Sequence, residues 1–139
     1  EKTQKAHVVA ELARRITTTI FKWRKIMDST ILRIYMPIRA KRKGKLTFWQ
    51  KFSGASLSTY LLNEAKSFGI EQAIFQRSSG GYLNGQKLVF DISEIAPLDL
   101  PQVVELVDKE DRLREFVEKF KNQITDCRVV LFKTSEVVK

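Results

Sequence analysis

Hydrophobic positions follow two different periods along the chain after Ser29. A two-residue alternation or a short apolar run, each typical of a strand, occurs at residues 31–36, 71–77, 87–92, 103–107 and 128–133. A three- to four-residue recurrence, typical of a helix with one buried face, runs from Leu57 to a stop at Gly69 and from the expected N-cap Asp108 to Ile124. The order strand, helix, strand, extended hairpin, strand, helix, strand predicts an α+β fold, a ferredoxin-like βαββαβ sandwich.

Both helices of such a fold pack on one face of the sheet, so the other face is left bare. An apolar sheet face is usually covered, and another copy of the chain is the expected cover. The capping-box spacing at residues 47–50 also predicts a short helical turn carrying Phe48, Trp49 and Phe52.

The N-terminal segment has a pattern of its own. Apolar residues at three- or four-residue steps predict a basic amphipathic helix over residues 6–25, although the run Thr17-Thr18-Thr19 weakens it because β-branched residues lose side-chain freedom in a helix. We therefore divide the chain into residues 1–26, this helix, and residues 27–139, the ferredoxin-like domain. The helix can lie on a membrane, dock on a partner, lead from an upstream membrane span or pack against its own domain.

The charge is concentrated in the first third of the chain. The net charge is +9, yet residues 1–51 hold 14 Lys and Arg against three acidic residues, a net +11, and the remainder is −2. Five cations fall within residues 39–45, which predicts an exposed basic loop. Such a surface attracts polyphosphates, nucleic acid or an anionic membrane, although it also simply improves solubility.

Few residues are suited to catalysis. His7 is the single imidazole and Cys127 the single thiol, which excludes a disulfide scaffold and leaves too few soft ligands for zinc. We interpret Cys127 as a small buried hydrophobic residue. Glu110 and Asp111 lie at the expected start of a helix, where the helix dipole favours acidic residues without any catalytic role. We expect no enzymatic activity, and the unpaired cysteine together with the lack of a membrane-length apolar run indicates a cytoplasmic protein, with membrane association through the basic helix as an option.

Anion binding has better candidates. Ser78-Ser79-Gly80-Gly81 follows Arg77, and backbone N–H groups in a glycine-rich turn can converge on phosphate oxygens beside a guanidinium. A plain hairpin turn is the alternative. The basic loop, with Lys45 next to Gly44, is added on grounds of charge alone: it could complete this phosphate site from a neighbouring subunit, and it could equally contact RNA or lipid.

Several motifs in order resemble a known family. They are Leu32-Arg33-Ile34-Tyr35, Gly44-Lys45, residues 57–65, Gly69-Ile70, Ala73, Arg77 with Gly81 and Tyr82, Leu100-Pro101 and residues 103–108. Residues 30–134 are thus similar to the PII-like family known as domain of unknown function 190. Its Arg-Gly-x-x-Gly-Phe-Gly signature is partly kept, because Ser78 and Leu83 replace two glycines, and residues 46–56 resemble an insertion.

The resemblance implies a homotrimer that holds adenine nucleotides in clefts between subunits, with a connector after the second strand that engages a target such as a membrane transporter or channel. Arg77, Gly81 and Tyr82 would lie at the base of that connector, and Gly80, Lys45 and Arg33 complete our candidate nucleotide site.

We therefore predict a non-enzymatic regulatory domain that needs no cofactor and binds ATP, ADP, AMP or cyclic AMP as an effector. One alternative is a cytoplasmic regulatory domain that is itself part of a membrane transport protein. Another is RNA binding, which the strands favour little because, Tyr35 apart, they lack exposed paired aromatic residues. A sensor of small amino-acid-like molecules is a further option on the same fold.

Overall fold

The computed structural model describes residues 1–27, 29–45, 47 and 56–133. The chain divides into two units, one built on the N-terminal helix, Glu1–Ser29, and one comprising Thr30–Lys133. Helix α1 (Lys2–Met27) confirms and extends the helix expected over residues 6–25. The turn predicted to carry Phe48, Trp49 and Phe52 lies outside the described residues.

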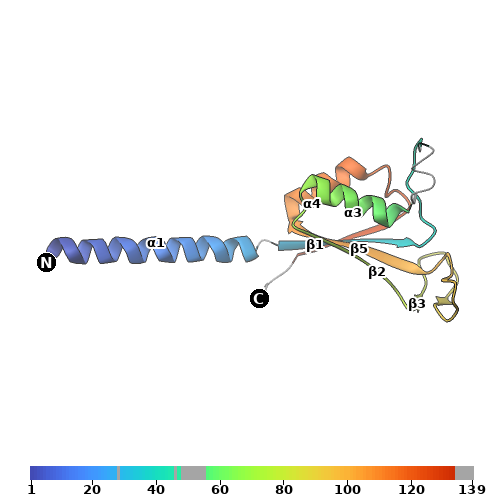
Figure 1. Cartoon of the computed structure of the whole chain (residues 1–139), viewed down its shortest axis with the longest axis horizontal. Coiled ribbons are helices and arrows are strands. Elements are labelled where there is room, and N and C mark those ends of the chain that lie inside the picture. Colours follow the sequence, from blue (N-terminus) through green and yellow to red (C-terminus); the bar gives the residue numbers. More distant parts are fainter. Residues whose placement is uncertain (28, 46, 48–55, 134–139) are drawn as a thin grey trace. The chain divides into compact units, whose positions relative to one another are not determined.

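The second unit has the predicted order of elements. β1 (Ser29–Pro37), α3 (Leu57–Phe68), β2 (Gln72–Arg77), β3 (Gly80–Gly81), β4 (Val89–Phe90), β5 (Pro101–Lys109), α4 (Glu110–Phe120) and β6 (Arg128–Lys133) follow one another along the chain (Figure 1). The main sheet has the order β2-β5-β1-β6, and β3 and β4 form a separate hairpin. Because β6 is antiparallel to β1 and β2 is antiparallel to β5, the fold is the predicted ferredoxin-like α+β sandwich.

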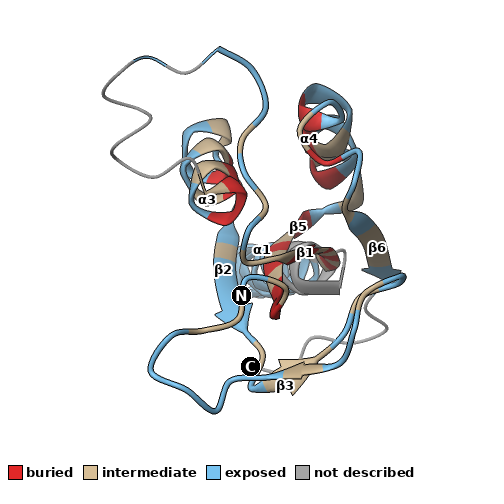
Figure 2. Ribbon diagram, turned by 90° about the vertical axis from the view of Figure 1, so that its right-hand side faces the viewer, coloured by how far each residue is buried: buried red, intermediate tan, exposed pale blue. Residues whose placement is uncertain are grey.

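Helices α3 and α4 cover the same face of the main sheet (Figure 2). Alternate residues of β1 and β5 point into the core beneath them. The two-residue period predicted this for β1, whereas β5 was predicted as a central strand from its nearly continuous apolar run. The fully buried side chains at its centre come from all four of these elements: Leu32, Ile34, Met36, Leu61, Val104, Leu106, Leu113 and Phe116. The glycine stop of α3 is also confirmed, since Gly69 adopts a left-handed conformation at φ 80°.

The second half of the predicted hairpin is shorter than expected. Residues 87–92 alternate in the sequence, but only Val89 and Phe90 pair with β3, because β3 itself has two residues. The residues on either side of this pair have no ladder partner and stay largely exposed, Ile92 to 90%. The alternation therefore does not mark a buried sheet face at this position.

The expected N-cap of the last helix is wrong by one residue. α4 begins at Glu110 after Lys109, and Asp108 is the penultimate residue of β5, 7% exposed. Its carboxylate accepts hydrogen bonds from the backbone N–H of Lys109 at 2.7 Å and of Glu71 at 3.1 Å. Asp108 thus ties the entrance of β2 to the end of β5. The helix also ends at Phe120, so the buried Ile124 lies beyond it.

This carboxylate supports a stability prediction. Asp108→Ala is expected to lower the free energy of unfolding by about 1–3 kcal/mol, because it removes a buried carboxylate and leaves the N–H of Glu71 without the acceptor of a part-buried hydrogen bond. Asp111→Ala is the matched control, since Asp111 is exposed in the first turn of α4 and interacts mainly with the helix dipole. Urea unfolding followed by circular dichroism measures both. Equal losses for the two variants would contradict the role given to Asp108.

Candidate functional site

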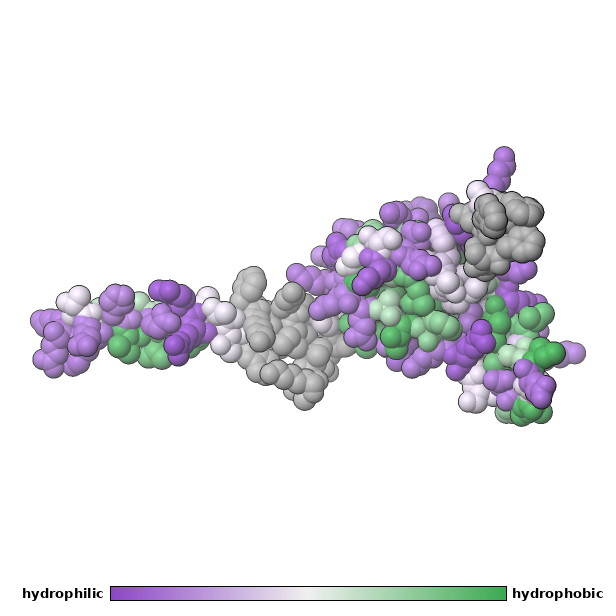
Figure 3. All heavy atoms as spheres, in the orientation of Figure 1, coloured by the Kyte–Doolittle hydropathy of each residue, from purple (hydrophilic) through white to green (hydrophobic). Residues whose placement is uncertain are grey.

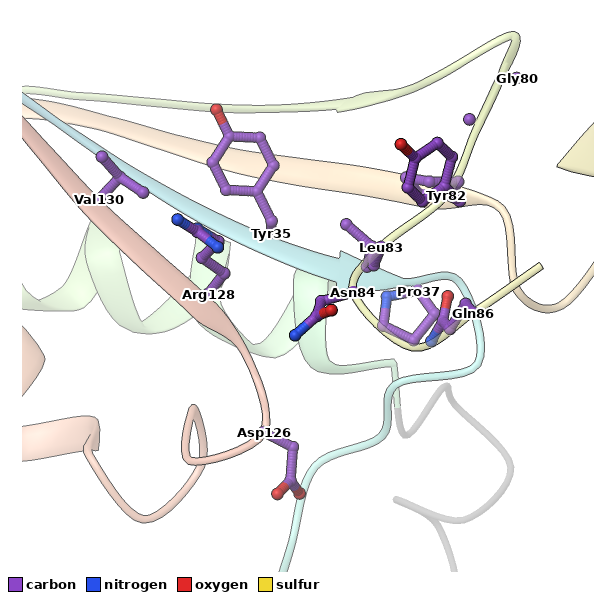
Figure 4. A pocket seen from close by; sticks show the side chains of 12 residues that line it. Tyr35, Pro37, Gly80, Tyr82, Leu83, Asn84, Gln86, Asp126, Arg128 and Val130 are labelled. Carbon is purple, nitrogen blue, oxygen red and sulfur yellow. The ribbon is translucent and has the colours of Figure 1, made fainter. Parts of the chain in front are cut away.

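A cleft of about 590 Å³ opens beside the bare face of the sheet, where the ends of β1 and β6 meet the connector that follows β2. Its size falls within the roughly 300–1,000 Å³ typical of small-molecule sites. Residues from these two strands, from the start of β5, from the connector and from the segment just before β6 line it (Figure 4): Tyr35, Pro37, Gly80, Gly81, Tyr82, Leu83, Asn84, Gln86, Pro101, Asp126, Arg128 and Val130.

The strand side of the cleft depends on the pairing of β1 with β6. In this antiparallel register Tyr35 is the direct partner of Arg128, and the two side chains stand next to each other at the cleft (Figure 4). Arg128 has no hydrogen-bond or ion-pair partner among the residues that the structure describes. A guanidinium with all its donors available beside an aromatic ring is suited to a planar or phosphorylated anion.

The connector side is held in place by backbone bonds. Both the N–H and the hydroxyl of Ser78 donate to the carbonyl of Pro101, at 3.0 and 2.8 Å. Asp91 donates from its N–H to the carbonyl of Ser79 at 2.9 Å, beside the β3–β4 pair. The connector is therefore fixed to the start of β5 where it leaves the sheet at Ser78. Its two halves then run side by side as the β3–β4 pair.

The two glycines of β3 have structural reasons to be glycine. A Cβ on Gly80 would lie 2.5 Å from Cδ1 of Phe90, so the ring can lie across the hairpin only if residue 80 has no side chain. Gly81 has a φ of 150°, a conformation that residues with a side chain rarely adopt. The alternative that Ser78–Gly81 is a plain hairpin turn is therefore wrong, because both glycines belong to strand β3 and the turn lies at Asn84 and Gly85. Both glycines also lie in the wall of the cleft.

A second, smaller cavity of about 300 Å³ adjoins the cleft and shares Pro37, Gln86 and Asp126 with it. Three cations of the basic loop line it: Arg39, Lys41 and Lys43. The backbone N–H of Lys43 donates to Oε1 of Gln123 at 2.7 Å, and Nε2 of Gln123 donates to the carbonyl of Lys43 at 3.0 Å. The ammonium of Lys43 pairs with Asp126 at 2.7 Å. The basic loop predicted for residues 39–45 is thus largely exposed, but it is anchored beside the cleft.

The structure brings together half of the candidate site residues. Gly80, Gly81 and Tyr82 line the cleft, whereas Arg77, Lys45 and Arg33 line neither cavity. Arg77 is exposed at the end of β2, without an ion-pair partner among the described residues.

Arg33 is already occupied by a partner within the sheet. Its Nε lies 2.7 Å from Oε2 of Glu105, and this hydrogen bond, followed by one to Tyr35, raises the pKa of the guanidinium above its ordinary value. Arg33 therefore neutralises the carboxylate of Glu105 on the bare sheet face. Fewer of its N–H donors remain available to a ligand.

Sequence reasoning missed Arg128, Asn84, Gln86 and Asp126 as residues of the site. Arg128 was assigned only to the last strand. A signal was nevertheless available: the first and last strands of a ferredoxin-like sheet are neighbours, so the beginning of the last strand lies opposite Tyr35. The amides of Asn84 and Gln86 had no comparable signal, because the path of the connector is not periodic.

Cys127 lines the second cavity but is not activated there. Burial, followed by the nearby Asp126 carboxylate, raises the pKa of the thiol to about 11. This agrees with its interpretation as a small apolar residue packed against the core. Within the described part of the chain, His, Cys, Asp and Glu do not gather into a group that could hold a metal ion.

The raised pKa predicts low thiol reactivity in the folded protein. Because a shift of two pKa units lowers the thiolate fraction at neutral pH on the order of a hundredfold, a chromogenic disulfide reagent should modify native Cys127 far more slowly than the guanidinium-unfolded chain. The rate should rise with pH toward 11. Since the chain has a single cysteine, the absorbance change reports this site alone, and equal native and unfolded rates would contradict the assignment.

These features define a ferredoxin-like α+β domain with a ligand-sized cleft beside an uncovered sheet face. The model of the family named domain of unknown function 190, described as an uncharacterized ACR, matches residues 29–136. The UPF0166 protein of Aquifex aeolicus (strain VF5) is 31% identical over 78 residues, which are 53% of this chain and 70% of that protein. The chain therefore belongs to the family of domain of unknown function 190, which confirms the resemblance indicated by its motifs.

Two solved structures are also similar. The chain matches a protein described as a PII-like signaling protein from Thermus thermophilus with a TM-score of 0.44 and 12% identity, over 76% of this chain and 87% of that chain. It matches an amidase of the hydantoinase/carbamoylase family from Burkholderia phymatum with a TM-score of 0.29 and 8% identity, over 76% of this chain and 27% of that one. Both TM-scores are below 0.5, so the family assignment rests on the sequence matches.

Proposed function

We propose that this domain is a non-enzymatic regulatory module that binds an adenine nucleotide in the cleft and passes its occupancy to a partner, a membrane transporter or channel. One observation carries the proposal: beside the glycine-rich connector, the cleft combines aromatic rings, side-chain amides and the guanidinium of Arg128, which has no partner among the described residues. Tyr35 and Tyr82 can stack on a base, Asn84 and Gln86 can hydrogen-bond its edge, and Arg128 can bind phosphate.

The adjoining basic cavity offers a place for further phosphates. Lys41 lines it without an ion-pair partner among the described residues, whereas Arg39 and Lys43 are paired with Asp99 and Asp126. A phosphate chain that leaves the cleft past Asp126 meets these cations. The cavity supports a phosphate site that includes the basic loop, but with the loop of the same subunit in place of the neighbouring one that the sequence suggested, and with Lys41 in the place given to Lys45.

The bare sheet face supports self-association. Apolar residues dominate it: Ile31, Ile74, Val103, Val107, Val130 and Phe132. Ile74 and Phe132 are 38% and 41% exposed, and Arg33 and Glu105 neutralise each other on this face, which leaves Arg128 at the cleft as an unpaired charge among the described residues. We propose that three copies cover one another's sheet faces and that each cleft, at the edge of this face, then lies at a subunit boundary.

The regulatory step follows from the position of the connector. Tyr82, Leu83, Asn84 and Gln86 belong to it and line the cleft, so a bound nucleotide contacts the segment directly. Farther along, Leu88, Ile92, Ile95 and Leu98 are more than half exposed and form the surface that a partner can read. Nucleotide contacts that order the connector would change this surface.

Titration calorimetry of residues 1–139 against ATP, ADP, AMP and cyclic AMP tests nucleotide binding, and light scattering tests the trimer. We expect binding at millimolar ligand or below, with an affinity that increases from AMP to ATP and loses this increase in Lys41→Ala. No heat with any of the four ligands from a folded protein would overturn nucleotide binding. Salt-sensitive binding to single-stranded RNA in its place would favour the RNA alternative.

A second arrangement has its own support. The basic helix α1 immediately precedes β1, which favours a regulatory domain that is itself part of a membrane transport protein. Among the described residues no helix is both long enough and apolar enough to cross a bilayer. In this arrangement the same cleft senses the nucleotide for the protein that carries it.

A further inference from the structure

Helix α1 carries a stripe of exposed apolar side chains along its length. Its members Val8, Val9, Leu12, Ile16 and Ile20 are each between 53% and 65% exposed. Their three- and four-residue steps place them on one side of the helix. Figure 3 shows a hydrophobic patch on the lower side of the middle of α1, with hydrophilic residues above it and around the N-terminal end.

The threonine run is compatible with an apolar environment around the helix. The hydroxyls of Thr17, Thr18 and Thr19 donate to the carbonyls four residues earlier, at 2.8, 2.9 and 2.8 Å. Each hydroxyl is therefore satisfied within the helix, and water need not supply a partner. These bonds also explain why a run expected to weaken the helix is tolerated inside it.

The rest of the helix surface is strongly cationic. Residues 1–27 contain seven Lys and Arg against two acidic residues, a net charge of +5. Glu11 pairs with Arg14 and Arg15, whose side chains are both 76% exposed, so each guanidinium keeps donors directed to the surroundings. A helix with one apolar side and an excess of exposed cations complements the surface of a bilayer, where apolar acyl chains lie beneath negatively charged headgroups.

A second copy of α1 fits the stripe less well. A coiled-coil seam needs apolar residues at both a and d positions over at least three heptads. If Val9 and Ile16 occupy the a positions, the d positions fall on Lys5, Leu12 and Thr19, of which only Leu12 is a good seam residue. If they occupy the d positions, Ala6, Ala13 and Ile20 fall at a, a seam that is apolar but short and has small alanines at two of its three a positions. The pattern favours insertion into lipid over helix pairing.

We propose that α1 binds the surface of an anionic lipid bilayer, with its apolar stripe among the acyl chains and its Lys and Arg residues at the lipid phosphates. This contact is independent of the nucleotide cleft. It would hold the regulatory domain at the membrane where a transporter or channel is located.

Co-sedimentation of residues 1–139 with vesicles tests the proposal. The vesicles are phosphatidylcholine alone and phosphatidylcholine with about a third phosphatidylglycerol, each at low salt and at about 0.5 M salt. We expect at least about tenfold stronger partitioning to the anionic vesicles at low salt, with most of this difference lost at high salt.

Two double variants separate the stripe from the rest of the helix. L12S/I16S should lower binding to anionic vesicles by about tenfold or more, because it removes two inserted side chains. H7S/A10S changes two residues on the opposite side and should bind like the unaltered chain, and circular dichroism checks that both variants keep the helix. A third variant, R14Q/R15Q, should weaken binding and reduce its salt dependence.

Three results would overturn the proposal. The first is equal partitioning to neutral and anionic vesicles. The second is binding that L12S/I16S leaves unchanged. The third is absence of lipid binding, combined with either of two signs that protein covers the stripe. One sign is light scattering that shows association through α1, and the other is amide-exchange protection of the stripe by its own domain. Nucleotide calorimetry on the same samples reports separately on the cleft.

Discussion

Replacing Phe116 by alanine is expected to lower the free energy of unfolding by about 3–5 kcal/mol. The side chain is completely buried at the centre of the core beneath α4. The centroid of its ring lies 4.6 Å from that of Phe120 and 5.7 Å from that of Phe68, which it meets edge-on. Because Phe68 belongs to α3, the ring of Phe116 joins α4 to α3. Alanine removes both aromatic contacts and leaves a cavity that rigid helices on a sheet cannot close.

Phe75→Ala is the matched control for this substitution. Phe75 lies on the edge strand β2 and is 41% exposed, so its removal should cost roughly 1 kcal/mol or less. Urea unfolding followed by fluorescence and circular dichroism gives both values with the same cooperativity test. A loss for Phe116→Ala no greater than that for Phe75→Ala would contradict this core arrangement.

Replacing Arg128 by alanine is expected to weaken adenine-nucleotide binding roughly tenfold to a hundredfold. The guanidinium is exposed at the cleft, opposite Tyr35, and has no partner among the described residues. A charged hydrogen bond to a phosphate is worth about 1.5–3 kcal/mol, which corresponds to this loss. Because Arg128 makes no side-chain hydrogen bond or ion pair within the described part of the chain, the unfolding free energy should change by less than about 0.5 kcal/mol.

Arg77→Ala separates two positions for the ligand. Arg77 is likewise an exposed arginine without a partner among the described residues, but it lies at the end of β2, outside the lining of the cleft. Calorimetry should show a larger loss for Arg128→Ala than for Arg77→Ala. A loss confined to Arg77→Ala would place the nucleotide at the base of the connector, as the family motif suggested, and would contradict its position in the cleft.

The elements of this fold follow from local patterns. Alternation in residues 31–36 and a nearly continuous apolar run at residues 103–107 identify two strands, and the helical period around Leu61 and Phe116 identifies the two helices above them. Each pattern involves residues only a few positions apart, and its period is the side-chain repeat of a strand or of a helix. Where the chain has no period, as in the connector after Arg77, sequence reasoning identified the glycines but not the neighbouring amides.

The role of Asp108 shows where local reasoning ends. Its sequence position before a helical pattern is typical of an N-cap, but one of the two donors that it binds is the N–H of Glu71, 37 residues away. A carboxylate binds the unpaired donors that the fold brings within reach, and the β2–β5 register decides which these are.

Spacing and composition are enough to predict the order of strands and helices, the family, the basic first third of the chain and the amphipathic helix at its beginning. The folded chain was needed to show that Tyr35 is the partner of Arg128, that the connector lines the cleft beside them and that Lys43 pairs with Asp126. Each of these contacts joins residues that are far apart along the chain. Their meeting depends on strand register and loop path, which are properties of the assembled sheet and not of any one segment.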